Sequence, residues 1–160
     1  MRKIIFLDRD GVVNVERGDY TWKVDDFEFT QNLFEALGNF SEKGYSFVII
    51  TNQGGIAKGL YGHEDVLRLN TIIAKEFENH NLELLDIYYS PYHSDFSKSL
   101  SRKPDSLMLE KAIDRYGIDV SNSYMIGDSE RDILAAQKVG VKGILIAANS
   151  SLTRILDQIK

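Results

Sequence analysis

Short apolar runs alternate with longer amphipathic stretches along the whole chain. The runs lie at residues 3–7, 46–50, 84–89, 124–126 and 143–147. Runs of this length, separated by single helices, are typical of βαβ units, in which parallel strands form a sheet with helices on both faces. We therefore expect an α/β fold built on a mostly parallel, five-stranded sheet.

The stretches between the runs carry apolar residues at helical spacing. Gly44, Gly117 and Gly140 each follow such a stretch, and glycine commonly ends a helix. Residues 90–104 show no clear periodicity and are predicted to form a functional or recognition loop. The predicted helices span residues 32–43, 63–80, 105 or 106 to 116, 130–139 and 152–159.

The composition is that of one folded domain. A chain of 160 residues leaves no room for two domains of ordinary size, so we expect a single domain over residues 1–160. The net charge of −5 argues against broad electrostatic binding of nucleic acid or anionic membranes. The first apolar run stops at Asp8, too early for a signal peptide or a membrane span. We expect a cytoplasmic monomer that binds neither nucleic acid nor membrane.

Polar and charged residues follow four of the predicted elements, where ligands bind in an open parallel sheet. Together they supply several carboxylates, a hydroxyl, amides and a basic pair. This mixture suits phosphoryl chemistry with a divalent cation, because Mg²⁺ prefers oxygen ligands. The segments are Asp8-Arg9-Asp10-Gly11, Thr51-Asn52-Gln53, the loop holding Arg102-Lys103, and Gly127-Asp128-Ser129.

These residue types allow a covalent mechanism. Asp8 can act as the nucleophile and form an aspartyl phosphate. Asp10 lies two residues on, hence on the same side of an extended segment, and can transfer the proton. Thr51 can hold phosphate oxygens, Lys103 can neutralise the phosphate, and Asp128 can complete the cation site. Taken alone, Asp8-Arg9-Asp10-Gly11 is more typical of a turn or helix cap and Arg102-Lys103 of a solvated loop, while the other two segments are equally typical of turns or caps. Their common place after strands favours catalysis.

The motifs FLDRDGVVN, IITNQGG, SRKP and MIGDSERD resemble those of the haloacid-dehalogenase (HAD) superfamily of phosphatases. The resemblance implies a Rossmann-like three-layer fold with strand order 5-4-1-2-3. It places the nucleophile at Asp8, the acid/base at Asp10, and the phosphate-binding residues at Thr51 and Lys103. It also implies a Mg²⁺ ion held by Asp8, Asp128 and the backbone carbonyl of Asp10.

Within that superfamily, the stretches TNQGGIAKG and DDFEF resemble the D,D-heptose 1,7-bisphosphate 7-phosphatases, which lack a large cap domain. The resemblance implies a small phosphorylated sugar as substrate, with Asn52 and Arg102 as substrate-binding residues. Ser129 departs from the lysine that is typical there, and its role is left open, as is that of Asp132.

Other functions remain open at this point. The related histidinol-phosphate phosphatases, or enzymes acting on other sugar phosphates, share these motifs. A signalling receiver domain also uses an acidic cluster, Thr and Lys, but its acceptor Asp follows the third strand, where this chain has Ser90-Pro91. A non-catalytic phosphate-binding scaffold is a further alternative, although the five residues Asp8, Asp10, Thr51, Lys103 and Asp128 are all intact.

The chain departs from these relatives in a loop that usually binds zinc through a Cys-x-His…Cys-x-Cys pattern. Those places hold Ser90, Tyr92, Ser99 and Ser101, and the chain has no cysteine. His93 alone cannot form a tetrahedral site, so we expect no zinc. The loop must then be held in another way, and the aromatic residues predicted to pack there are Tyr88, Tyr89, Tyr92 and Phe96.

Overall fold

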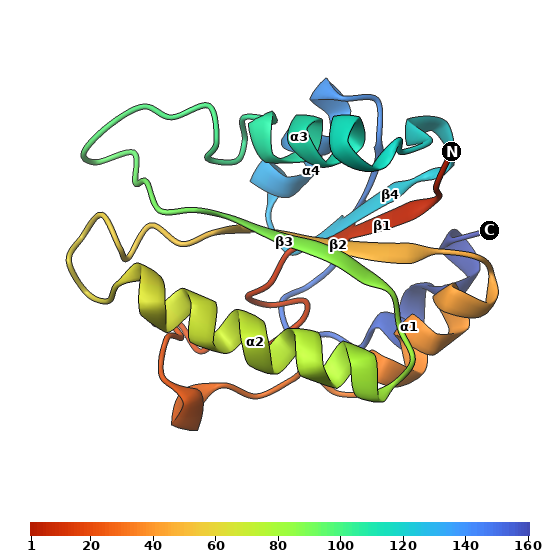
Figure 1. The fold of residues 1–160 in the computed structure, drawn as a ribbon, viewed down its shortest axis with the longest axis horizontal. Helices are drawn as coiled ribbons and strands as arrows, with labels where there is room; N and C mark the ends of the chain where they lie inside the picture. The colour runs from red at the N-terminus through yellow and green to blue at the C-terminus, as the bar shows by residue number, and fades with distance from the viewer.

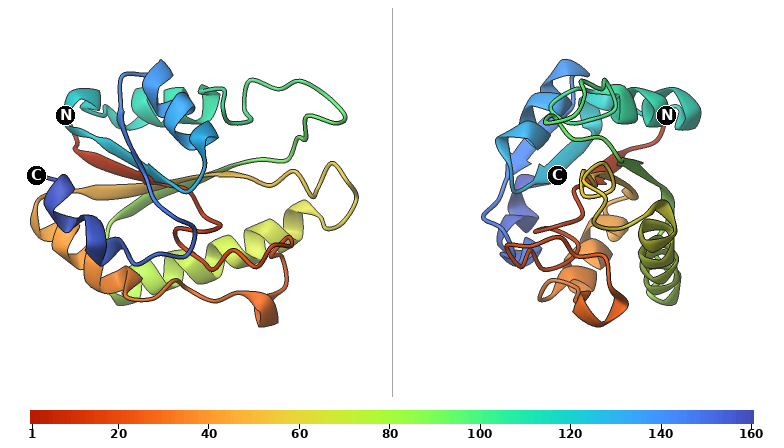
Figure 2. Two further views of the ribbon diagram at one scale, coloured as in Figure 1. Left: turned by 180° about the vertical axis from the view of Figure 1, so that it is seen from behind. Right: turned by 90° about the vertical axis from the view of Figure 1, so that its left-hand side faces the viewer.

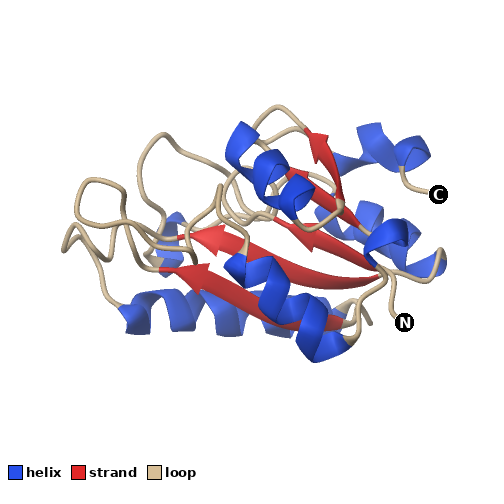
Figure 3. Cartoon of the chain, turned by 90° about the horizontal axis from the view of Figure 1, so that it is seen from above, coloured by secondary structure: helices blue, strands red, loops and turns tan.

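A computed structural model describes all residues from 1 to 160 and shows one five-stranded sheet. The strand order is β3-β2-β1-β4-β5 and every pairing is parallel, which confirms the expected order. The strands all point toward the end of the molecule opposite the two termini (Figure 3). They are β1 (Ile4–Leu7), β2 (Ser46–Asn52), β3 (Leu84–Ser90), β4 (Tyr124–Gly127) and β5 (Lys142–Leu145).

Helices cover both faces of the sheet, giving three layers with no large cap (Figure 1). On one face lie α1 (Leu33–Glu42), α2 (His63–Asn79) and η3 (Leu152–Gln158). On the other lie α3 (Leu107–Tyr116) and α4 (Glu130–Lys138). The closing helix is present as predicted, but it is a 3₁₀ helix; two shorter 3₁₀ turns are η1 (Val24–Asp26) and η2 (Val120–Asn122).

The alternation of side chains along β1 explains why two cores form. Ile5 and Leu7 join a cluster with α1, α2 and η3, whereas Ile4 and Phe6 join a second cluster with α3 and α4. All four side chains are fully buried, because successive residues of a strand point to opposite faces. β1 is therefore anchored on both sides, and the residue that follows it is held firmly.

Long loops gather beyond the carboxyl ends of the strands. The right-hand view of Figure 2 looks onto this end, where the connections β1–α1, β2–α2 and β3–α3 lie together. Separately, no helix is both long enough and apolar enough to cross a membrane.

Candidate active site

The four segments singled out in the sequence meet at this end of the sheet, around a cavity of about 410 Å³. Of the expected residues, Thr51 alone does not line this cavity. It still belongs to β2, which continues through Asn52, and it is only 1% exposed. The expected residues that line the cavity are Asp8, Asp10, Asn52, Arg102, Lys103 and Asp128.

Lys103 lies at the centre of the site, and its side chain is fully engaged. Its Nζ donates to Asp8 Oδ1 at 2.9 Å, to the carbonyl of Ile50 at 2.8 Å and to Asp132 Oδ1 at 2.5 Å. These are all the protons that an ammonium group has. Burial lowers the pKa of Lys103, but the charges of Asp8 and Asp132 outweigh it and the net shift is upward. Lys103 is therefore charged and fixed in place.

Asp132 has no role assigned by the sequence pattern, yet it is part of this cluster. It is 1% exposed, and its second oxygen accepts from the backbone N–H of Ser129 at 3.1 Å. Ser129 in turn caps α4, with its side chain accepting from the N–H of Arg131. The start of α4 therefore orients the carboxylate that holds Lys103.

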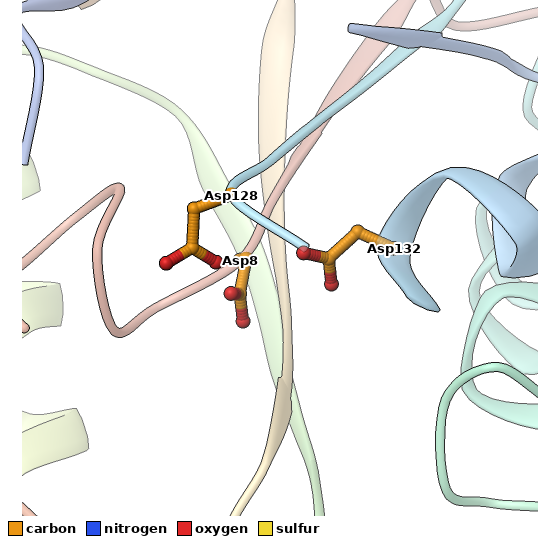
Figure 4. Close-up of side chains that lie close together, drawn as sticks. All are labelled: Asp8, Asp128 and Asp132. Carbon is orange, nitrogen blue, oxygen red and sulfur yellow. The ribbon is translucent and has the colours of Figure 1, made fainter. Parts of the chain in front are cut away.

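Oxygens of Asp8, Asp128 and Asp132 lie within 4.8 Å of one another. The carboxyl groups of Asp8 and Asp128 are side by side, and Asp132 approaches them from α4 (Figure 4). Burial raises the pKa of Asp8 well above its usual range, although Lys103 opposes the shift; burial also raises the pKa of Asp128. One ammonium cannot balance three carboxylates, so the donor set fits a divalent cation that prefers oxygen ligands.

Two glycines allow these carboxylates to approach so closely. Gly11 has φ +90°, and a Cβ there would collide with the Asp128 carboxylate. A Cβ on Gly127 would collide with the side chain of Asp132. The glycines in the DRDG and IGD motifs are thus required by the packing of the acidic cluster.

Asp10 is held by three side chains. Its Oδ1 accepts from Arg9 Nη2 at 2.9 Å and from Asn14 Nδ2 at 3.0 Å, and its Oδ2 accepts from Gln53 Nε2 at 3.0 Å. Arg9 is fully buried and also binds the carbonyl of Thr21. This arrangement fixes the Asp10 carboxylate on the cavity wall beside Asp8.

Gln53 and Tyr61 support the site, although the sequence does not identify them as site residues. The Gln53 amide donates to both Asp10 and Thr51 Oγ1, and its Oε1 accepts from the Tyr61 hydroxyl at 2.6 Å. Burial raises the pKa of Tyr61, which keeps its hydroxyl a donor. The place of Gln53 directly after a strand could have indicated a role in the site, whereas nothing in the sequence around Tyr61, eight residues further on, indicates one.

Asn52 and Arg102 both lie on the cavity wall, but they differ in how many of their hydrogen-bonding groups are already used. Both ends of the Asn52 amide are hydrogen-bonded to the Lys103 backbone, each at 3.0 Å, so Asn52 positions the loop that carries Lys103. Arg102 makes one hydrogen bond, from Nη1 to the carbonyl of Tyr92 at 2.9 Å. The rest of its guanidinium is available to a ligand.

The loop before Lys103 is held by a serine network rather than by aromatic packing. Ser101 Oγ lies 2.9 Å from Ser90 Oγ and 2.8 Å from Ser99 Oγ, and the Ser101 N–H also reaches Ser99. The expectation that Tyr92 and Phe96 pack in the loop is wrong: they are 47% and 66% exposed. A short polar loop offers these rings no apolar surface to cover.

The two other aromatic residues named for this role lie in β3, and their contacts lead away from the loop. Tyr88 packs against the core that contains α3 and α4. The Tyr89 hydroxyl lies 2.7 Å from Nδ1 of His63, the first residue of α2. They brace the sheet edge from which the loop departs.

Comparisons with known proteins identify the family to which the chain is similar. Residues 100–158 match the HAD-hydrolase-like family model. A D-glycero-β-D-manno-heptose-1,7-bisphosphate 7-phosphatase of Haemophilus ducreyi is 36% identical over 159 residues, covering 95% of this chain and 87% of the relative. The corresponding α-heptose enzyme of Campylobacter jejuni is 38% identical over 147 residues, covering 92% and 83%.

A solved structure has the same fold. The D,D-heptose 1,7-bisphosphate phosphatase of B. bronchiseptica, solved with magnesium and phosphate, superimposes with a TM-score of 0.83 at 27% identity, over 98% of this chain and 86% of that one. The HAD family implies Mg²⁺, and the acidic cluster supplies suitable ligands. The chain therefore belongs to the HAD-like hydrolases and is a phosphatase of that family.

Proposed function

We propose that this phosphatase removes the 7-phosphate from a D-glycero-D-manno-heptose 1,7-bisphosphate in a Mg²⁺-dependent reaction, through an aspartyl phosphate on Asp8. The observation that carries the proposal is the arrangement of Asp8: one oxygen is bound by Lys103, and the carboxylate lies beside that of Asp128. The relatives named above act on the β or the α anomer of this compound. We place the activity in a single cytoplasmic domain spanning residues 1–160, acting as a monomer.

In the first step, the free oxygen of Asp8 attacks phosphorus and the bond from phosphorus to the sugar oxygen breaks. Lys103 keeps Asp8 aligned and places a positive charge beside the phosphate oxygens. Asp10 gives its proton to the departing sugar oxygen. The products of this step are the heptose 1-phosphate and an aspartyl phosphate.

In the second step, water attacks the phosphorus of the aspartyl phosphate and gives its proton to Asp10. This regenerates Asp8 and releases inorganic phosphate. Gln53, Arg9 and Asn14 hold the Asp10 carboxylate in one position throughout, as their hydrogen bonds indicate. The Thr51 hydroxyl accepts from Gln53 Nε2 at 2.9 Å and donates only over a long 3.3 Å to the carbonyl of Asn52, so its proton can turn toward a phosphate oxygen.

The residues that would hold Mg²⁺ are Asp8 and Asp128, with the backbone carbonyl of Asp10. When bound, the ion supplies the positive charge that lets a carboxylate approach a phosphate dianion. Both oxygens of Asp132 are already bound, by Lys103 and by the Ser129 N–H. We therefore assign Asp132 to positioning Lys103 rather than to direct coordination of the ion.

Phosphate release from both anomers of heptose 1,7-bisphosphate, histidinol phosphate and other sugar phosphates tests the proposal. We expect kcat/KM to be highest for a heptose bisphosphate, and Asp8→Asn to lower kcat about 10³-fold or more. Asp114→Asn removes an exposed carboxylate on α3 and is the matched control. The proposal is wrong if histidinol phosphate is the better substrate, or if Asp8→Asn retains activity.

A further inference from the structure

Two arginines line the active-site cavity without a carboxylate partner. Arg102 makes a single hydrogen bond, to the Tyr92 carbonyl. Arg131 is exposed at the cavity rim, and its guanidinium makes no hydrogen bond and no ion pair within the chain; its backbone N–H donates to Ser129 Oγ. In a chain whose acidic residues outnumber its basic ones, two cations left unpaired in one cavity are available for an anion.

The charges on this wall act on one another. Burial lowers the pKa of the Arg102 guanidinium, and the charge of Arg131 lowers it further. Burial likewise lowers the pKa of His93, with further contributions from Lys58, Arg102 and Arg131 that exceed the opposing effect of Asp95. The cationic side chains on this wall therefore repel one another, and a bound anion would relieve that repulsion.

The backbone also shapes this wall. A Cβ on Gly54 would lie 3.0 Å from Arg102 Nη1 and 2.8 Å from His93 Cδ2. The Arg102 guanidinium and the His93 ring therefore both rest on Gly54, which follows β2. Their place depends on the absence of a side chain at this residue.

Arg131 occupies a position that its helix does not favour. It lies in the first turn of α4, where the helix dipole opposes a positive charge, beside Glu130 and Asp132, which the dipole does favour. Arg131 is also three residues beyond Asp128, so its side chain projects from the rim of the acidic cluster. A locally unfavourable charge at a cavity wall points to a ligand that compensates for it.

We propose that Arg131 binds the second phosphate of the substrate, the one that is not hydrolysed, beside Arg102, whose part in substrate binding the family resemblance already implies. The proposal rests on the proposed function above and deepens it by naming the group that selects a bisphosphate over a monophosphate. Two guanidinium groups match the charge of a phosphate dianion and can each offer two parallel N–H donors. The acidic side chains Glu16 and Asp19, which also line the cavity, are left for the sugar hydroxyls.

The test compares kcat/KM for heptose 1,7-bisphosphate with kcat/KM for heptose 7-phosphate, which lacks the second phosphate. We expect the wild type to favour the bisphosphate, and Arg131→Gln to reduce this ratio about tenfold or more, chiefly through KM. Arg131→Lys, which keeps a charge but loses the fork of donors, should retain part of the preference. Arg154→Gln, at an exposed arginine of η3 without an ion pair, should leave the ratio unchanged.

The outcomes separate this proposal from the one on which it rests. An unchanged ratio in Arg131→Gln, or a wild type that hydrolyses both compounds equally well, would overturn the second phosphate site and leave the phosphatase activity standing. A wild type that hydrolyses neither compound overturns the proposed function, and the second site with it. Circular dichroism of each variant excludes misfolding as the cause of a changed ratio.

Discussion

Two polar regions that position Lys103 are built on opposite principles. The charged cluster, formed by Asp8, Lys103, Asp128 and Asp132, gathers three carboxylates around one ammonium. The serine network, formed by Ser90, Ser99 and Ser101, contains only neutral hydroxyls that satisfy one another. The first region holds reactive groups at a cost in stability, whereas the second holds a loop in place without any charge.

The difference shows which region needs an ion. Buried carboxylates in excess of cations are costly, and a divalent cation removes that cost. A set of hydroxyls that are already hydrogen-bonded has nothing to gain from a metal and no strong ligand to offer one. We therefore expect the charged cluster to respond to Mg²⁺ and the serine network to be indifferent to metals.

The largest effect is expected from removing the cation of the charged cluster. Lys103→Met leaves Asp8 and Asp132 buried without their partner, which should lower the free energy of unfolding by about 3–5 kcal/mol and abolish activity. Urea denaturation measures the first effect and phosphate release the second. Lys98→Met, at an exposed lysine of the same loop without an ion pair, should change neither; equal stability of the two variants would contradict the account.

Removing a carboxylate should have the opposite effect on stability. In EDTA near neutral pH, Asp128→Asn should raise the free energy of unfolding by about 0.5–2 kcal/mol while activity with Mg²⁺ is lost. Calorimetry with and without Mg²⁺ checks this: the wild type should gain stability from the ion and the variant should gain much less. A destabilised variant in EDTA would show that the Asp128 charge is already compensated in the folded protein.

The same charges predict how stability depends on pH. Burial raises the pKa of Asp8 and Asp128, so the folded protein keeps protons that the unfolded chain loses above a pH of about 4. The free energy of unfolding in EDTA should therefore fall as the pH rises from that value toward the raised pKa values. The fall should be smaller in Asp128→Asn, which can be followed by urea denaturation at several pH values.

The serine network should give a smaller effect. Ser101→Ala removes the hydroxyl that joins Ser90 to Ser99, which should cost about 1–2 kcal/mol of stability and lower kcat/KM several-fold, because Arg102 and Lys103 follow directly. Ser97→Ala, at an exposed serine of the same loop, is the control. If both variants behave alike, the network does not hold the loop.

The smallest effect is expected at the exposed ring of the loop. Phe96→Ser should change stability by less than about 0.5 kcal/mol, since the ring is 66% exposed and packs against no core. Thermal unfolding is sufficient to measure it. A loss comparable to that of Ser101→Ala would show that the aromatic residues, and not the serines, order the loop.

The fold can be predicted from the sequence because the patterns that mark its strands and helices are local. Buried strands of a parallel sheet are continuously apolar, so β1 and β2 are visible as runs, and the groups that follow them must share one edge of the sheet. The pattern of runs and polar segments is therefore enough to predict that Asp8, Lys103 and Asp128 lie together. The resemblance in the motifs adds the strand order, which local patterns do not determine.

The remaining features depend on contacts between distant residues. The hydrogen bond from Tyr61 to Gln53, and the pairing of Asn52 with the Lys103 backbone, leave no periodic signal. Serines in an irregular loop look solvated, so the network around Ser101 cannot be expected from their pattern. Arg131, in a helix whose pattern gives it no role, is recognised only because it lines the cavity.

The central claim is that the charged cluster requires Mg²⁺ and that the serine network replaces a metal. The most direct test is phosphate release from heptose 1,7-bisphosphate by protein stripped of metals and then supplied with Mg²⁺ alone, with Zn²⁺ alone or with both. We expect full activity with Mg²⁺ alone and no further gain from Zn²⁺. Activity that needs Zn²⁺, or that persists in EDTA without any added metal, would contradict this claim.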